Sequence, residues 1–245
     1  MKINILHLYP NLMNLYGEYA NVTVLERHLS DQGFEVAVTK ADSVQDVELS
    51  EFQFIYIGAG MERSQKHALA DLMQKKEDFH TFSKAKKVIL FTGSAYEFLG
   101  KTITDSEGNT YEALGIGAFS AVQQNTKRIT ADCYASCAFL DKIVVGFINK
   151  CSDITENSEP IFNMKMGYGD NKDGKDEGFR KENTFGTYMT GPLLVKNPAM
   201  MQYMVKCIGK VVNPDFEYKT VEYPYEQKAY EVTERKLRER MESNG

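Results

Sequence analysis

The chain has 245 residues, of which 42% are hydrophobic and 26% are charged, and its formal net charge at pH 7 is −5. This length and apolar content suffice for one large α/β domain, so we expect a single domain over residues 1–245. The negative net charge gives no indication of a nucleic-acid partner. No apolar stretch approaches the roughly eighteen residues of a membrane span, and the first residues lack a secretory signal. We therefore expect a cytoplasmic protein.

The first hundred residues predict alternating strands and helices. Short apolar runs indicate strands at 2–8 (KINILHL), 34–39 (FEVAVT), 52–57 (FQFIYI) and 87–91. Apolar residues at helical spacing predict a helix beginning near Asn21, its expected N-cap, and a second helix over 62–75. Strands and helices that alternate at such short intervals are typical of an α/β fold with a mostly parallel central sheet flanked by helices.

From about residue 114 the pattern changes to short β segments joined by turns. Strands are expected within 115–124, 127–136, 142–149 and 160–169, and a polar, glycine-rich hairpin or loop over 167–183. An apolar strand over 185–195, interrupted by Pro192, precedes helices at 198–210 and 225–241. No repeat or linker divides this half of the chain into a further domain.

The segment VILFTGSAYEFLG, residues 88–100, predicts a sharp turn from a strand into a helix. Small residues stand at the corner, namely Gly93, Ser94 and Ala95, and the helix is expected to begin near Tyr96. Enzymes of the α/β class display a catalytic nucleophile at such a corner, above the carboxyl end of the strand. The question raised by this segment is whether a nucleophile is present.

Cysteine and histidine usage gives no indication of a metal centre. The cysteines form no CxxC pair, and buried reduced thiols are favoured over metal ligands or nucleophiles; they are Cys133, Cys137, Cys151 and Cys207. All four histidines lie within the first eighty residues, and we expect His7 and His67 to be structural or exposed to solvent. We expect neither a metal ion nor a cofactor.

Several motifs in the same order along nearly the whole chain carry a resemblance to a known family. They are LYPNLMNLYGEYANVTVLERHL (8–29), IYIGAGMERSQ (55–65), GSAYEFLGK (93–101), TKRIT (126–130), MGYGDNKDGKDEGF (166–179) and FGTYMTGPLLVKNP (185–198). The chain resembles the class I glutamine amidotransferase subunit of bacterial lipid II isoglutaminyl synthase, a relative of cobyric acid synthase amidotransferase domains. The resemblance implies a flavodoxin-like fold and a role in peptidoglycan precursor amidation.

In that family a cysteine at the corner attacks the glutamine amide, and a histidine on a late strand transfers the proton. The ammonia passes to a partner ligase that uses ATP, which implies a heterodimer with a Mur-ligase-like subunit. Aligning YEFLG with the family's corner places Gly93 on the cysteine, and aligning GTYMTGP places Thr190 on the histidine. Both reactive side chains are therefore absent. The first hypothesis is an inactive subunit that binds a partner ligase, or a small ligand in a vestigial glutamine pocket.

Two other hypotheses stay open at this point. A shift of one residue would make Ser94 the nucleophile of an active amidotransferase or hydrolase, although a small residue accepted by the tight turn is the favoured interpretation. The third hypothesis is a free-standing module that binds or senses a small molecule.

The resemblance also implies residues that bind substrate. Gly58, Ala59 and Gly60 align with a glycine-rich loop whose backbone amides could hold an anion, although a tight turn explains these residues equally well. Arg128 in TKRIT aligns with an arginine near the family's active-site mouth, and an exposed charge at a strand end is the equally weighted alternative.

Overall fold

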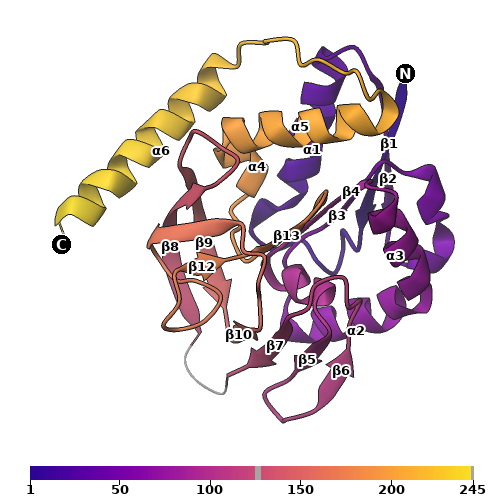
Figure 1. The fold of residues 1–245 in the computed structure, drawn as a ribbon, viewed down its shortest axis with the longest axis vertical. Coiled ribbons are helices and arrows are strands. Elements are labelled where there is room, and N and C mark those ends of the chain that lie inside the picture. Colours follow the sequence, from indigo (N-terminus) through magenta and orange to yellow (C-terminus); the bar gives the residue numbers. More distant parts are fainter. Residues whose placement is uncertain (125–127, 244–245) are drawn as a thin grey trace.

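A computed structural model describes residues 1–124 and 128–243 of the chain (Figure 1). The largest sheet among these residues has six strands. Their order is β13-β14-β4-β3-β1-β2. The bounds are β1 Lys2–Leu8, β2 Glu35–Ala41, β3 Phe54–Ile57, β4 Val88–Thr92, β13 Phe179–Lys181 and β14 Thr184–Thr187. All neighbouring strands pair in parallel except β13 with β14. The five parallel strands follow the flavodoxin-like order 2-1-3-4-5.

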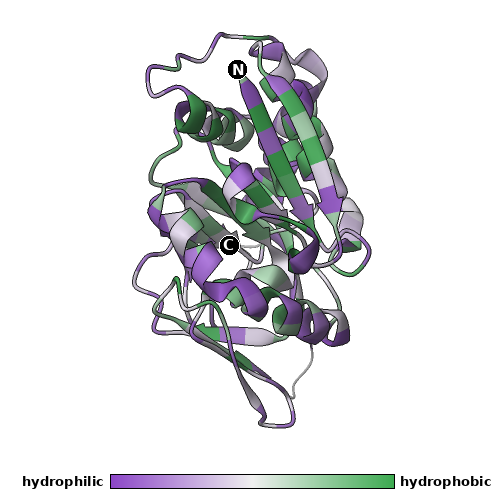
Figure 2. Ribbon diagram, turned by 90° about the vertical axis from the view of Figure 1, so that its right-hand side faces the viewer, coloured by the Kyte–Doolittle hydropathy of each residue, from purple (hydrophilic) through white to green (hydrophobic). Residues whose placement is uncertain are grey.

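Helices cover this sheet. In Figure 1, α1 (Tyr19–Asp31), α4 (Leu193–Lys196) and α5 (Pro198–Val212) form one group, and α2 (Glu62–Leu72) and α3 (Lys76–Lys84) form another, with the sheet between them. Every residue of β3 and β4 is buried, as expected for parallel strands covered on both faces. Figure 2 shows the hydrophobic colour concentrated along the strands of this sheet.

The 3₁₀ helices among the connections are η1 (Leu15–Gly17), η2 (Val44–Asp46), η3 (Leu49–Glu51), η4 (Met73–Lys75) and η5 (Gly93–Leu99).

Two four-stranded sheets built from the middle of the chain lie beside the central sheet. One has the order β10-β7-β5-β6 and the other β12-β11-β8-β9. Their bounds are β5 Thr102–Thr104, β6 Thr110–Glu112, β7 Ser120–Gln123, β8 Ile129–Cys137, β9 Val144–Lys150, β10 Ser152–Thr155, β11 Phe162–Met166 and β12 Asp176–Glu177. A bridge between Phe147 of β9 and Thr190 joins the second of these sheets to the segment after β14.

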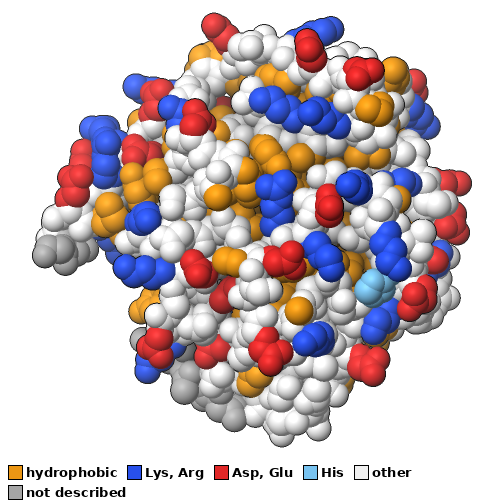
Figure 3. Space-filling view, in the orientation of Figure 1, with side chains coloured by type: hydrophobic (Ala, Val, Ile, Leu, Met, Phe, Trp, Pro, Cys, Tyr) orange, Lys and Arg blue, Asp and Glu red, His pale blue; other side chains and the backbone are white. Residues whose placement is uncertain are grey.

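The last helix, α6 (Pro224–Ser243), extends away from the body of the molecule (Figure 1). Its buried residue is Tyr230, which packs with Tyr134 and Val145 and donates a hydrogen bond to the Ile143 carbonyl oxygen (2.9 Å). Lysine and arginine side chains are intermixed with aspartate and glutamate over the face shown in Figure 3. Within residues 1–124 and 128–243, no helix has both the length and the apolar content of a membrane span.

The expected bounds of the first strand are confirmed, whereas the start of the first helix is wrong. Helix α1 begins at Tyr19, with Glu18 at the N-cap position. Asn21 lies inside the helix, is fully buried, and bonds to other elements instead of capping the helix. Its Nδ2 donates to the Tyr56 hydroxyl (2.9 Å), and its Oδ1 accepts from the Leu194 amide (2.8 Å).

Three further expected elements are shorter or different. The helix expected over 62–75 ends at Leu72, because the chain continues there as the 3₁₀ helix η4 and then leaves the helical conformation at Lys75 before α3 begins. Residues 167–183 contain the short strands β12 and β13. The strand expected over 185–195 stops at Thr187, because the next amides bond to side chains: that of Tyr188 to Glu177 and that of Met189 to Thr187.

The helix expected after the corner is the 3₁₀ helix η5. The carbonyl oxygens at the end of η5 accept hydrogen bonds from a later loop. The Leu114 amide donates to the Phe98 carbonyl oxygen, and the Gly117 amide donates to that of Leu99. Those carbonyl oxygens therefore do not continue an α-helix, and the chain becomes extended at Gly100.

Candidate functional site

The corner lies at the carboxyl edge of the central sheet, where open α/β sheets bind their ligands. Strand β4 ends at Thr92, and Gly93 has φ +60°, in the left-handed region that favours glycine. A Cβ atom at Gly93 would lie 2.5 Å from the Cβ of Ala59 and 3.1 Å from the Cγ2 of Thr190. The structure therefore brings together three of the segments singled out in the sequence, those at 58–60, 93–94 and 190.

Thr190 is held against strand β9. Its amide and its hydroxyl both donate to the carbonyl oxygen of Phe147, over 2.9 Å and 3.0 Å, and the residue is buried. The hydroxyl is thus directed toward β9, whereas the methyl group faces Gly93.

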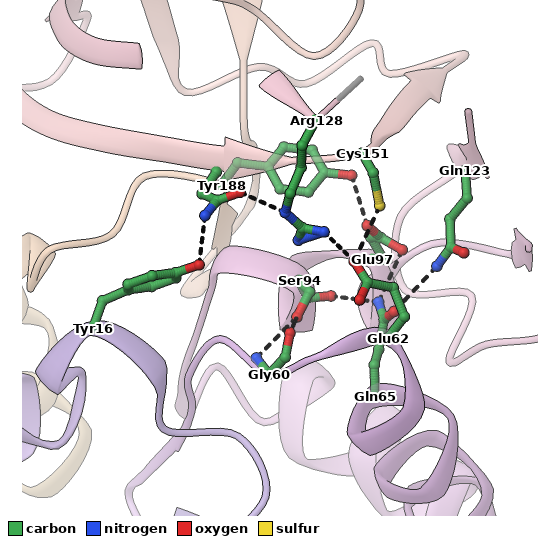
Figure 4. Close-up of polar contacts among 11 residues, drawn as sticks. Tyr16, Gly60, Glu62, Gln65, Ser94, Glu97, Gln123, Arg128, Cys151 and Tyr188 are labelled. Carbon is green, nitrogen blue, oxygen red and sulfur yellow. Dashed lines mark hydrogen bonds and ion pairs between the residues drawn. The ribbon is translucent and has the colours of Figure 1, made fainter. Parts of the chain in front are cut away.

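Ser94 is tied to the glycine-rich loop (Figure 4). Its hydroxyl donates to the Gly60 carbonyl oxygen (3.0 Å), and its Oγ accepts from the Gly60 amide (3.0 Å). The Met13 side chain packs against the glycine-rich loop, so closely that a Cβ atom at Gly60 would lie 2.2 Å from the Met13 sulfur. The Gly60 amide is therefore already bonded within the chain.

A buried carboxylate that sequence reasoning missed connects the elements around the corner. The Oε1 atom of Glu18 accepts from the Gly191 amide (3.0 Å). Its Oε2 atom accepts from the Tyr56 hydroxyl (2.9 Å) and the Thr92 hydroxyl. Burial raises the pKa of Glu18. Glu18 thereby holds β3, the end of β4 and the segment after Thr190 in one arrangement. The sequence feature that could have indicated this role is the position of Glu18 within the motif NLYGEYAN.

A second group of buried ionisable residues lies behind the corner. Glu97 accepts from Tyr188 (3.0 Å) and from Gln65 (2.9 Å), and burial raises its pKa. Glu177 accepts from the Tyr188 amide (2.6 Å) and the Thr187 hydroxyl (2.7 Å). Burial and the neighbouring Asp170 raise the pKa of Glu177 to about 8. These bonds fix the loop that leads from β14 to Thr190.

A cavity of about 620 Å³ lies outward from the corner, and we call it the outer pocket. It is lined by Glu62, Arg63, Lys66, Ser106, Gln123, Gln124, Arg128 and Cys151. The first turns of α2 form one wall, and the residues next to β7, β8 and β9 form the other (Figure 4). Neither Gly93 nor Thr190 is among the lining residues.

Arg128 faces the outer pocket and is bonded across it. Its guanidinium forms an ion pair with Glu62 and donates from Nε to the Asn149 side chain (2.6 Å). The thiol of Cys151 donates to the same Glu62 carboxylate (3.3 Å). Burial, followed by Glu62, raises the pKa of Cys151 to about 11. The pairing of Arg128 with Glu62 and Cys151 was not predicted from the sequence.

The other cysteines and the histidines lie elsewhere. Cys133 and Cys137 are buried in β8, as expected. The rings of His67 and His80 bond to the Arg63 and Leu114 carbonyl oxygens, and His28 bonds to Glu226. His7 is buried in β1, where burial lowers its pKa to about 4.

Comparison with known proteins identifies the family. The model of the CobB/CobQ-like glutamine amidotransferase domain matches residues 4–198, and the chain belongs to this family. It is 27% identical over 206 residues to the lipid II isoglutaminyl synthase (glutamine-hydrolyzing) subunit GatD of Streptococcus pneumoniae, covering 83% of this chain and 79% of the relative. It is also 27% identical over 231 residues to the subunit of the same name from Staphylococcus aureus, covering 94% of each chain.

Solved structures confirm the fold class. The glutaminase domain of the Trypanosoma brucei protein CTPS superposes with a TM-score of 0.54 and 10% sequence identity, covering 91% of this chain and 98% of that one. Both the predicted flavodoxin-like fold and the predicted resemblance to a lipid II isoglutaminyl synthase subunit are therefore confirmed.

Proposed function

We propose that this chain is a glutamine amidotransferase-like subunit that does not hydrolyse glutamine and that acts by binding a partner ligase. The proposal assigns Gly93 to the lost nucleophile position and Thr190 to the lost base position. It is supported by the closeness of the two positions, since a Cβ atom at Gly93 would lie 3.1 Å from the Cγ2 of Thr190.

The chemistry of glutamine hydrolysis explains why these substitutions matter. A carboxamide is a poor electrophile, so hydrolysis needs an activated nucleophile and donors that hold the oxyanion. Gly93 offers no nucleophile, and a threonine hydroxyl does not act as a base near pH 7. The observation that carries the proposal is the position of Ala59, whose methyl group fills the space that the Cβ of a nucleophile at 93 would need.

The alternative, an active hydrolase with Ser94 as nucleophile, gains no support from the contacts of that residue. The Ser94 hydroxyl is bonded in both directions to the backbone of Gly60. A serine nucleophile needs a base within hydrogen-bond reach, and the only partners of this hydroxyl among the described residues belong to Gly60.

The proposed partner rests on the names of the relatives and on the family resemblance of the sequence motifs. Both are named as subunits of a synthase, so we propose a heterodimer with a Mur-ligase-like subunit in the cytoplasm, in the amidation of lipid II. The proposed role of this chain is to bind that subunit, with Gly58, Ala59, Gly60 and Arg128 as remnants of the substrate site.

A glutaminase assay tests the proposal. The chain is assayed alone and together with a Mur-ligase-like subunit from the same organism, and the ammonia released from glutamine is compared with that of a blank. We expect no release above the blank and a stable heterodimer on co-purification. Release that disappears in Ser94→Ala would instead establish the serine alternative, and release that persists would indicate another nucleophile. Absence of a complex would contradict the partner-binding role.

A further inference from the structure

We propose that a cavity beside the start of α6 binds a neutral, planar heterocycle of the nucleobase class, and that this ligand holds α6 to the body of the molecule. The cavity has a volume of about 270 Å³, and we call it the α6 cavity. Its walls come from α1, the start of α5, the turn between β8 and β9, the segment that joins α5 to α6, and α6 itself. None of its lining residues lines the outer pocket, so the inference does not depend on whether the corner hydrolyses glutamine.

The segment between α5 and α6, residues 213–223, is held on the body by side chains at the end of α1. The Gln32 side chain bonds to both backbone groups of Lys219, over 2.9 Å and 2.7 Å. The Tyr223 hydroxyl donates to Asp31 (2.8 Å). Figure 1 shows this segment running back over α5 before α6 begins. Because residues of the segment line the cavity, a ligand there contacts the body and the root of α6 together.

Aromatic rings that are already fixed form part of the wall. The Tyr223 ring stacks on the imidazole of His28, with ring centroids 3.8 Å apart. The Tyr230 hydroxyl donates to the Ile143 carbonyl oxygen (2.9 Å), which orients a second ring, and Tyr218 supplies a third. Rings held in place before binding lose little conformational freedom when a flat ligand arrives. Nucleobases stack on aromatic side chains of this kind.

Polar groups without partners line the same space. The side chains of Gln202 and Thr220 line the cavity, and neither makes a hydrogen bond to any residue within 1–124 or 128–243. The Gln227 side-chain nitrogen donates to Glu231 (3.0 Å), which leaves its carbonyl oxygen as an acceptor. A purely apolar ligand would leave these groups unpaired. The edge of a nucleobase offers donors and acceptors side by side, in the pattern that a glutamine amide binds.

The charges around the cavity favour a neutral ligand. Asp141 and Lys142 are exposed, lie next to each other in the chain and have opposite signs. Burial, followed by the charge of Arg27, lowers the pKa of His28 to about 4, so its imidazole is neutral near pH 7. A ligand with a net charge would therefore lose water without gaining a matching charge.

Saturation-transfer NMR with adenine as the probe tests the inference. The comparison probe is D-ribose, which has hydrogen-bonding groups but no planar ring. We expect adenine to bind with a Kd of about 1 mM or tighter and ribose not to bind. Because the cavity is neutral, added salt should leave adenine binding unchanged.

Two substitutions localise the site. Gln202→Met keeps the length of the side chain and removes its hydrogen bonds, so it should weaken adenine binding about threefold to tenfold. Ala199→Leu adds volume to a residue that lines the cavity, and it should weaken binding further. The matched control is Gln74→Met, the same change at an exposed position in η4, which should leave binding unchanged.

Proteolysis measures whether the ligand holds α6. Lys219 is exposed and lies between two residues that line the cavity, so trypsin cleaves after it only when the segment opens. Adenine at about five times its Kd should slow this cleavage about sixfold in the unaltered protein and in Gln74→Met. At the same concentration, Gln202→Met should be protected only about 1.5-fold to 3-fold.

Four results would overturn the proposed site: no binding of adenine, equal binding of ribose, loss of binding when salt is added, or equal weakening in Gln202→Met and Gln74→Met. Cleavage after Lys219 at an unchanged rate in the presence of bound adenine would overturn the proposed role in holding α6.

Discussion

The methyl group of Ala59 and the α-carbon of Gly93 face each other so closely that a side chain at 93 would begin 2.5 Å from that methyl group. Real Cβ atoms do not approach so closely, and the atom in the way is a short, rigid methyl group. The two residues therefore form a matched pair, in which the alanine is compatible with the glycine and incompatible with any larger residue there.

The first prediction follows from this pair. Gly93→Cys should destabilise the protein by about 2–3 kcal/mol, because a residue with a Cβ at positive φ costs on the order of 1–2 kcal/mol and the clash adds to it. Adding Ala59→Gly removes the clash, so part of that loss should be regained. Urea unfolding of both single variants and the double variant measures the coupling. If the two effects simply add, Ala59 is not the obstacle at this corner.

The second prediction concerns the reactivity of an introduced thiol. In the background of Gly93→Cys with Ala59→Gly, adding Thr190→His places an imidazole opposite the new cysteine. An adjacent imidazolium lowers the pKa of a thiol below its ordinary value of about 8.5. We expect the new thiol to be alkylated faster at neutral pH than in the variant that keeps Thr190. Peptide mass spectrometry identifies the modified residue, and the four native cysteines serve as internal controls.

An unchanged alkylation rate in a folded triple variant would mean that positions 93 and 190 do not form a reacting pair. The assignment of the lost nucleophile and base would then have to be abandoned.

The elements that were predicted correctly are those that local patterns determine. The strand over Lys2–Leu8 has its expected bounds because its apolar run is short and ends at a turn. The 3₁₀ geometry of η5 could not be predicted, because it depends on the amides of Leu114 and Gly117, which arrive from a later loop.

The same distinction applies to the candidate site. Alignment of motifs pointed to Gly93 and Thr190, which do meet. The pairing of Arg128 with Glu62 and the burial of Glu18 depend on contacts between distant segments, and no periodicity in the sequence reports such contacts.

The third prediction concerns Cys151 in the outer pocket. Burial and the Glu62 carboxylate raise the pKa of this thiol to about 11, so little thiolate forms near pH 8. Glu62→Gln removes the negative charge next to the sulfur and leaves Arg128 without its acidic partner. Both changes favour the thiolate, so Cys151 should be alkylated several-fold faster at pH 8. The half-buried Cys207 lies outside the pocket and should react at an unchanged rate. Equal acceleration at both sites would indicate a general loosening of the fold.

The fourth prediction concerns the pH dependence of stability, and Glu177 carries it. The pKa of Glu177 is about 8 in the folded protein, whereas an unfolded chain has the ordinary value of 4.5. Between these values the folded state holds a proton that the unfolded state has released. The free energy of unfolding should therefore fall as the pH rises toward 8.

Other titratable groups limit the pH range over which Glu177 dominates the pH dependence of stability. Asp170, with a pKa raised to about 6, acts in the same direction at lower pH. His7 and His28, with pKa values lowered to about 4, act in the opposite direction up to their ordinary value of 6.5. Between pH 6.5 and pH 8 Asp170 is mostly ionised, but the two histidines of the unfolded chain lose about the remaining half of their protons, which offsets part of the fall in stability. The buried Glu97 and Glu18, whose pKa values are also raised, can only add to the slope of Glu177.

We therefore expect the free energy of unfolding to fall by about 1–2 kcal/mol from pH 6.5 to pH 8, since one proton corresponds to about 1.4 kcal/mol per pH unit. Glu177→Gln keeps a side chain that can bond to the Tyr188 amide and the Thr187 hydroxyl, and it should remove most of that slope. Glu77→Gln, an identical change on the exposed face of α3, is the control and should keep the slope. Urea unfolding at several pH values measures all three proteins. If Glu177→Gln and Glu77→Gln retain the same slope, the proton is held elsewhere in the buried cluster.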